Sequence, residues 1–143
     1  MQVTLYVYDL SGGMAALYSQ ALIGKFIEVV PHTSIVVEGV EVYFGQGILE
    51  AIPESTHLGR PLHKIDMGTS EVTIEELQQY LEAISPNWAP DSYNLLHHNC
   101  NHFTNELCEF LVGTGIPSEY MSVAEIVAAT PLGQMLSTAS APV

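Results

Sequence analysis

The sequence predicts an α+β fold in which a small antiparallel sheet packs against helices, with a cysteine at the N-terminus of one helix. Strand and helix patterns follow one another without the regular strand–helix alternation of a parallel sheet. Two strand patterns are separated only by Glu38-Gly39, which is typical of a hairpin turn. Apolar residues at helical spacing begin at about Cys100 and end at Gly113. A length of 143 residues suits a single domain.

The first half of the chain carries most of the strand patterns. Alternating and β-branched residues predict strands at 3–9, 32–37, 40–44 and 48–52. Between the first two, apolar residues from Met14 to Leu22 predict a helix that stops at Gly24, and residues 26–30 are expected to be extended. Residues 53–70 are expected to be mostly loop, with a short strand near 62–65.

The second half of the chain is predicted to be helical, and two of its helices carry a capping-box signal. Thr73 and Glu76 have the capping-box spacing in front of a run of apolar residues, so a helix is expected to begin at Thr73. Ser122 and Glu125 repeat that spacing, which predicts that the last helix starts there and stops near Pro131.

Composition and charge exclude several classes of protein. Three basic residues stand against 16 acidic ones, and the formal net charge of −13 disfavours binding to nucleic acids and to anionic membranes. The sequence has neither an apolar run long enough to span a bilayer nor the basic start of a secretory signal. Cys100 and Cys108 would lie about 12 Å apart on one helix, too far for a disulfide. A reducing compartment, the cytoplasm or the nucleus, is therefore expected.

Cys100 is the residue best placed for chemistry. On a helical wheel it lies at the edge of the buried stripe formed by Phe103, Thr104, Leu107 and Leu111, whereas His102 lies on the opposite face. The free N–H groups and the dipole at a helix N-terminus favour a thiolate. The dipole contributes only about 0.3–1 kcal/mol, so the thiol needs a nearby imidazole to become a nucleophile.

Among the six histidines, His32 is the best candidate for that base. It begins a strand that continues into apolar residues, and a histidine fixed on a central strand can face a helix N-terminus across a cleft. An ordinary buried histidine on a strand is the alternative interpretation. His57 and His63 fall in a predicted loop, where solvated histidines are common, and His97 and His98 directly precede the cysteine helix.

Metal binding is a second chemical interpretation of the same segment. His97, His98, Cys100 and His102 are four zinc-ligand types within six residues. Structural zinc sites usually join two separated pairs of ligands, whereas these four lie in one segment and the wheel separates Cys100 from His102. The spacing therefore disfavours zinc, and no metal or other cofactor is expected.

Three blocks of sequence together resemble the PPPDE superfamily, the group of deSUMOylating isopeptidase-like (DeSI) cysteine proteases. They are His32-Thr33-Ser34-Ile35-Val36-Val37, Tyr43-Phe44-Gly45-Gln46-Gly47-Ile48, and Tyr93-Asn94-Leu95-Leu96 leading to Asn99-Cys100-Asn101-His102-Phe103-Thr104-Asn105. The resemblance extends over about residues 2–135. It implies a peptidase domain at residues 1–135, and the Ser/Ala/Pro-rich residues 136–143 are expected to form a flexible tail or linker.

The resemblance implies a permuted papain-like fold with a Cys–His dyad, in which Cys100 is the nucleophile and His32 is the base. The implied reaction is hydrolysis of the isopeptide bond between SUMO or ubiquitin and a lysine side chain, so the implied partners are SUMO or ubiquitin conjugates. The family also implies that a homodimer can form. Some members of the family carry an aromatic residue directly before the histidine, whereas this chain has Pro31 at that position.

The oxyanion of such a reaction requires hydrogen-bond donors. The backbone N–H of Cys100, at the helix start, is one candidate, and the side chains of Gln46, Asn99 and Asn101 are candidates for the second. Two alternative functions remain on the same fold. One is hydrolysis of S-acyl thioesters, which needs the same dyad and an apolar groove, and the other is non-catalytic binding of a ubiquitin-like protein.

Overall fold

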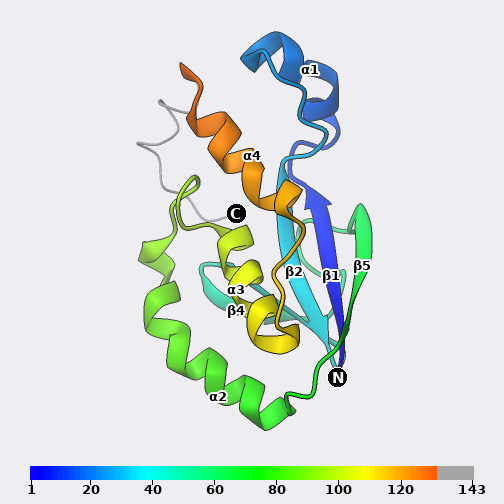
Figure 1. The fold of residues 1–143 in the computed structure, drawn as a ribbon, viewed down its shortest axis with the longest axis vertical. Coiled ribbons are helices and arrows are strands. Elements are labelled where there is room, and N and C mark those ends of the chain that lie inside the picture. Colours follow the sequence, from blue (N-terminus) through cyan, green and yellow to red (C-terminus); the bar gives the residue numbers. More distant parts are fainter. Residues whose placement is uncertain (132–143) are drawn as a thin grey trace.

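The computed structural model describes residues 1–131, in which a five-stranded antiparallel sheet is packed against helices (Figure 1). The strands are β1 (Gln2–Asp9), β2 (Pro31–Val37), β3 (Val40–Gly45), β4 (Gly47–Ala51) and β5 (His63–Thr69). Their order in the sheet is β4-β3-β2-β1-β5, so β2, which carries His32, is the central strand. The α+β class is confirmed.

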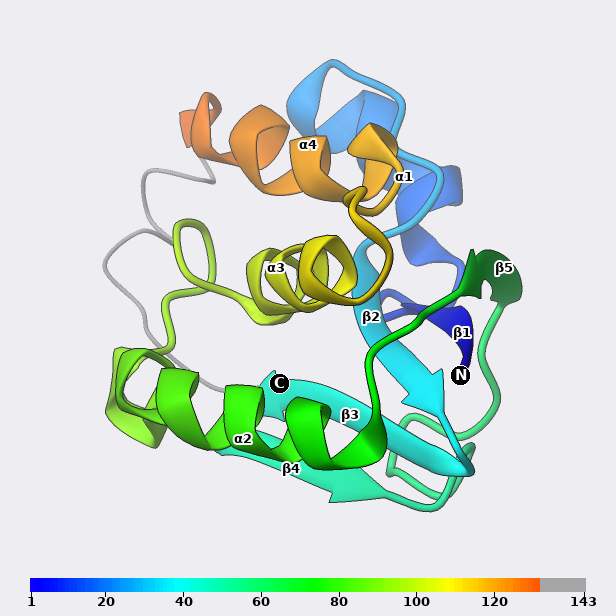
Figure 2. The ribbon, with the colours of Figure 1, turned by 60° about the horizontal axis from the view of Figure 1, so that its bottom comes forward.

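Helix α3 is the helix that packs most closely on the sheet. The helices are α1 (Met14–Ile23), α2 (Ile74–Ile84), α3 (Cys100–Val112) and α4 (Ser118–Ala128), with short 3₁₀ helices η1 (Ser85–Trp88) and η2 (Pro90–Ser92). Figure 2 shows α3 lying against the sheet between α2 and α4. Its Phe103 and Leu107 are fully buried together with Ile35 and Phe44 of the sheet. This packing fixes the start of α3 against β2 and β3.

Local signals predicted several element boundaries correctly. Glu38 and Gly39 have φ angles of 47° and 74°, the left-handed pair that a two-residue hairpin turn requires. Thr73 caps α2 with both hydrogen bonds of the capping box: its hydroxyl accepts from the Glu76 N–H, and the Glu76 carboxylate accepts from the Thr73 N–H. Gly24 ends α1 in the left-handed conformation.

Two elements differ from the sequence-based expectation. Helix α4 begins at Ser118, not at Ser122, because Pro117 occupies the N-cap and Tyr120 is buried within the first turn. Ser122 therefore lies inside the helix, where its hydroxyl donates to the Glu119 carbonyl. Strand β5 extends to Thr69, well beyond the predicted 62–65, because it pairs with β1 along its length.

The predicted boundary between residues 1–135 and 136–143 lies outside the described residues. Within residues 1–131, no helix has the length and apolar composition needed to cross a bilayer.

Candidate active site

The N-terminus of α3 is held by a reciprocal cap. The Asn99 side chain accepts from the backbone N–H groups of Asn101 and His102 at 2.9 and 3.2 Å, and its amide donates to the Leu95 carbonyl at 3.0 Å. The Nδ1 atom of His102 accepts from the Asn99 N–H at 3.1 Å. Cys100 is therefore the first residue of the helix, and its N–H has no carbonyl partner within the helix.

Three hydrogen bonds join the first turn of α3 to the residues on either side of His32. The Asn101 amide donates to the Pro31 carbonyl at 2.9 Å, and the Thr33 hydroxyl donates to the Asn101 side-chain oxygen at 2.7 Å. The Thr104 hydroxyl donates to the Thr33 carbonyl at 3.0 Å. Because all of these groups are buried, the helix start and the strand segment around His32 form one rigid unit.

The Cys100 thiol is buried at the junction of α3, β2 and the segment that follows η2. Its side chain is 2% exposed, and the Tyr93 hydroxyl donates to its sulfur at 3.9 Å. The backbone N–H of Thr33 also interacts with the sulfur in the direction that favours the thiolate. Burial outweighs these contacts and raises the pKa of the Cys100 thiol to about 11. The thiol is therefore neutral at rest, although its position at a helix N-terminus favours the thiolate.

His32 is buried between two tyrosine rings. Its ring centroid lies 5.7 Å from that of Tyr8 and 5.6 Å from that of Tyr43. Burial lowers its pKa to about 4, and its Nδ1 atom has no hydrogen-bond partner among the described residues. Strand β2 pairs with β3 only from Ile35 to Val37, so the stretch that holds His32 and Thr33 has no β3 partner. The first turn of α3, which Cys100 begins, is hydrogen-bonded to Pro31 and Thr33 in this stretch.

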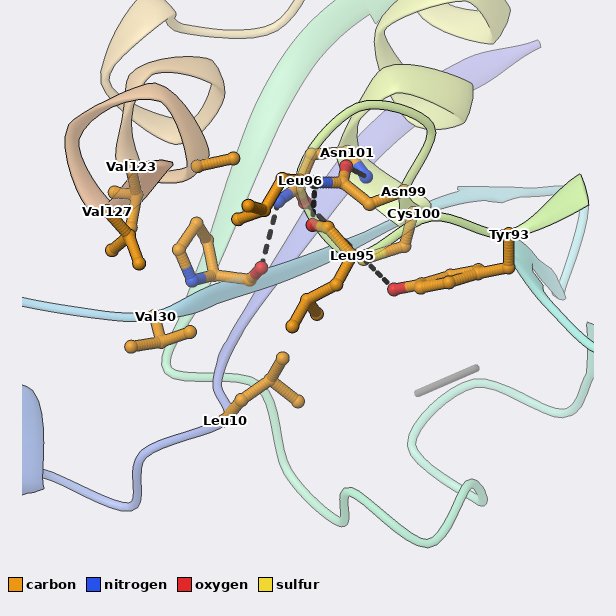
Figure 3. Close-up of a pocket in the computed structure, with 12 residues that line it drawn as sticks. Leu10, Val30, Tyr93, Leu95, Leu96, Asn99, Cys100, Asn101, Val123 and Val127 are labelled. Atoms are coloured by element: carbon orange, nitrogen blue, oxygen red, sulfur yellow. Dashed lines mark hydrogen bonds between the residues drawn. The ribbon is translucent and has the colours of Figure 1, made fainter. Parts of the chain in front are cut away.

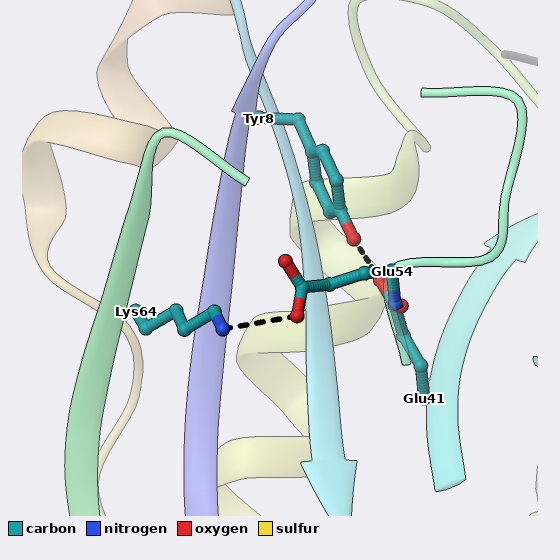
Figure 4. Close-up of polar contacts among 4 residues, drawn as sticks. All are labelled: Tyr8, Glu41, Glu54 and Lys64. Atoms are coloured by element: carbon teal, nitrogen blue, oxygen red, sulfur yellow. Dashed lines mark hydrogen bonds and ion pairs between the residues drawn. The ribbon is translucent and has the colours of Figure 1, made fainter. Parts of the chain in front are cut away.

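A buried carboxylate lies on the His32 side of the sheet, where the sequence pattern did not indicate one. Glu41 is completely buried and accepts hydrogen bonds from Tyr8 at 2.6 Å and from the Glu54 N–H at 3.0 Å (Figure 4). It also accepts from the Ser34 hydroxyl at 2.5 Å. Glu54 also pairs with Lys64 at 3.0 Å. Glu41 thus fixes the Tyr8 ring that packs against His32. The chain around Glu54 also covers this carboxylate, since the Glu54 N–H donates to it.

A cavity of about 240 Å³ opens onto Cys100 (Figure 3). Its walls are mainly apolar and include Leu10, Val30, Leu95, Leu96, Val123 and Val127. Cys100, Tyr93 and Pro31 also line it. The cavity offers a substrate carbonyl an approach to the sulfur.

The other predicted site residues occupy distinct positions. Gln46 is exposed between β3 and β4, whereas the side-chain amides of Asn99 and Asn101 are both engaged in hydrogen bonds to backbone carbonyls. The Nδ1 atom of His98 lies 3.0 Å from the Ser92 carbonyl oxygen, and its ring stacks on Trp88. Within residues 1–131, no three histidine, cysteine or acidic side chains are grouped so as to hold a metal ion.

Comparison with known proteins identifies the family. The family model described as "PPPDE putative peptidase domain" matches residues 1–141. The chain belongs to the PPPDE peptidase family. This PPPDE domain is 44% identical over 136 residues to Desumoylating isopeptidase 1 of Rattus norvegicus and 43% identical to that of Homo sapiens, covering 94% of this chain and 81% of each relative. DeSI-like protein sdu1 of Schizosaccharomyces pombe is 30% identical over 139 residues, covering 92% of this chain and 68% of the relative.

Membership confirms the resemblance drawn from the sequence blocks. The PPPDE domain has the permuted papain-like fold, in which the histidine strand precedes the cysteine helix along the chain. It is a homologue of desumoylating isopeptidases and a member of a cysteine peptidase family.

Proposed function

We propose that this PPPDE domain is a cysteine isopeptidase that releases SUMO from lysine side chains, with Cys100 as nucleophile and His32 as base. The placement of Cys100 carries the proposal: it begins α3, lines the cavity and lies beside the strand segment that holds His32. SUMO is the proposed modifier because the rat and human relatives are named as desumoylating isopeptidases. The acidic surface favours encounter with a basic face of the conjugate.

The first step is acyl transfer to sulfur. His32 accepts the Cys100 proton as the sulfur attacks the carbonyl carbon of the C-terminal glycine, and the carbonyl π electrons move to oxygen. The Cys100 N–H donates to this oxyanion. The intermediate then collapses, the carbon–nitrogen bond breaks, and the imidazolium of His32 gives its proton to the departing lysine amine.

The second step is hydrolysis of the thioester. His32, neutral again, accepts a proton from a water molecule as the water oxygen attacks the thioester carbonyl. Collapse of this second intermediate breaks the carbon–sulfur bond, and the proton returns from His32 to the Cys100 sulfur. The products are a free SUMO C-terminus and a free lysine, and the enzyme is restored.

The proposal is tested with a SUMO–peptide isopeptide substrate and with its ubiquitin counterpart at matched concentrations. We expect SUMO cleavage, and we expect Cys100→Ala and His32→Ala each to reduce it by about 10³-fold or more. His63→Ala, at an exposed histidine of β5, is the matched control and should retain activity. Cleavage of ubiquitin alone would reassign the modifier. Binding of SUMO without cleavage by the unmodified domain would refute catalysis.

Hydrolysis of S-acyl thioesters is a second candidate, favoured by the apolar walls of the cavity. The thiol and base would act as above, but an acyl chain would occupy the space beside Val123 and Val127. Val127→Trp would fill part of that space. If two methylenes of a long chain lost their burial, long-chain thioester hydrolysis would fall roughly tenfold. An acetyl thioester and the SUMO isopeptide should be cleaved as before, and an equal loss on all three would exclude an acyl-chain site.

A further inference from the structure

Tyr93 holds a hydroxyl group against the nucleophile, and neither the family match nor the sequence pattern gives it a role. Its side chain is 2% exposed, its ring stacks on Phe44 at a centroid distance of 5.2 Å, and its hydroxyl donates to the Cys100 sulfur at 3.9 Å. Figure 3 shows this hydroxyl pointing at the sulfur. The packing against Phe44 fixes where the hydroxyl can reach.

The Tyr93 hydroxyl and the Cys100 N–H converge on the same space. Both residues line the cavity that opens onto the sulfur. The Tyr93 hydroxyl donates to the Cys100 sulfur, and the Cys100 N–H, at the first position of α3, has no carbonyl partner within the helix. Burial raises the Tyr93 pKa, so the hydroxyl keeps its proton and remains a donor.

The side-chain amides of the nearby asparagines already serve the fold. The Asn101 amide donates to the Pro31 carbonyl at 2.9 Å, and the Asn99 amide donates to the Leu95 carbonyl at 3.0 Å. Turning either amide toward a substrate would leave a buried carbonyl unpaired, which costs free energy. The Tyr93 O–H, by contrast, can turn about the carbon–oxygen bond from the sulfur to a neighbouring oxygen.

We propose that the Tyr93 hydroxyl is the second oxyanion donor of the active site and acts together with the Cys100 N–H. This inference rests on the proposed function. Before the attack, the hydroxyl donates to the sulfur. As the carbon–sulfur bond forms and His32 takes the proton, negative charge appears on the former carbonyl oxygen, and the hydroxyl turns to that oxygen. No proton leaves Tyr93 at any step. Tyr93 is in this account a catalytic residue of both acylation and deacylation.

The test compares two reactions of the same sulfur in Tyr93→Phe, which removes the hydroxyl and keeps the ring that stacks on Phe44. Isopeptide hydrolysis develops an oxyanion, whereas alkylation by iodoacetamide is a displacement at a saturated carbon and develops none. We expect kcat for SUMO–peptide hydrolysis to fall about 10²-fold, the usual effect of removing one oxyanion donor. We expect the alkylation rate of Cys100 to fall by less than about tenfold.

An equal fall in both rates, or no fall in hydrolysis, would overturn the proposal, because Tyr93 would then act on the thiol alone or not at all. Tyr80→Phe is the matched control, since Tyr80 stacks on Phe110 and should change neither rate. The thermal midpoint of each variant checks that it is folded. If Tyr93→Phe does not fold, the comparison is made with 3-fluorotyrosine at position 93. Its O–H is a stronger donor and should change the rate of isopeptide hydrolysis but not the rate of Cys100 alkylation.

The Cys100→Ala and Tyr93→Phe variants separate a wrong role for Tyr93 from a wrong function of the domain. Loss of hydrolysis in Cys100→Ala with full hydrolysis in Tyr93→Phe would overturn only the role of Tyr93. Hydrolysis that persists in Cys100→Ala would overturn the proposed nucleophile, and with it the oxyanion site. A SUMO C-terminal aldehyde gives an independent measure, since its hemithioacetal carries the same oxygen. It should bind Tyr93→Phe about tenfold or more weakly than the unmodified domain.

Discussion

His32→Gln should make folding less sensitive to acid. The imidazole of His32 is 1% exposed, and burial lowers its pKa from 6.5 to about 4. In the unfolded chain the same imidazole protonates near its ordinary pKa, so the unfolded state binds more protons between these two values. Stability contributed by the neutral imidazole is therefore complete above pH 6.5 and is lost as the pH falls toward 4.

The magnitude follows from the two pKa values. One pKa unit corresponds to about 1.4 kcal/mol, so a pKa lowered from 6.5 to about 4 corresponds to roughly 3 kcal/mol once the unfolded imidazole is fully charged and the folded one begins to protonate. Between pH 7 and pH 4.5, the protonation equilibrium of His32 should lower the free energy of unfolding by about 2.5 kcal/mol. Glutamine at position 32 does not titrate and contributes no such loss.

Urea unfolding at pH 7 and pH 4.5 measures how much free energy of unfolding each protein loses, and the two losses are then compared. The unmodified domain should lose about 2.5 kcal/mol more than His32→Gln between pH 7 and pH 4.5, because the other titrating groups are common to both proteins. His63→Gln, at an exposed histidine, is the matched control and should lose as much as the unmodified domain. Equal losses in His32→Gln and the unmodified domain would refute the interpretation of His32 as a buried, neutral imidazole.

Three further predictions concern groups around the site. His102→Gln should retain most SUMO–peptide hydrolysis, because His102 caps α3 and a glutamine oxygen can accept the same N–H; a loss as large as that of His32→Ala would show that the base is misassigned. Glu41→Ala should lower the free energy of unfolding in urea by about 3 kcal/mol, since it leaves buried donors unpaired, whereas Glu41→Gln should cost clearly less. Brief iodoacetamide treatment near neutral pH should label Cys100 before Cys108, because Cys100 lines the cavity and Cys108 is buried in the core; preferential labelling of Cys108 in peptide maps would contradict this.

Elements with a strong local signal were predictable from the sequence. The hairpin at Glu38-Gly39 depends on two residues that tolerate left-handed backbone, and the start of α2 depends on two side chains that cap each other. Cys100 was placed at the start of its helix by the spacing of the apolar residues that follow it. Each of these features is decided by contacts within a few residues of chain.

Features that depend on distant contacts were not predictable in the same way. Ser122 and Glu125 carry a capping signal, but burial of Tyr120 extends α4 beyond it toward the N-terminus. Glu41 is buried on a hairpin strand, and the chain around Glu54, 13 residues further on, donates the N–H that meets its carboxylate. Tyr93 could be placed before the cysteine helix, but its contact with the sulfur requires the turns η1 and η2 to bring it there.

The same distinction applies to the protonation state of the proposed dyad. A helix N-terminus stabilises a thiolate by less than about one pKa unit, whereas burial raises the Cys100 pKa to about 11 and lowers that of His32 to about 4. Both groups are thus neutral at rest, so the proton must move as the sulfur attacks. The charge that then appears is concentrated on the substrate oxygen in a cavity with mainly apolar walls. In such surroundings each hydrogen-bond donor directed at that oxygen has a large effect on the rate of hydrolysis. We therefore expect the single hydroxyl of Tyr93 to have a large effect on that rate.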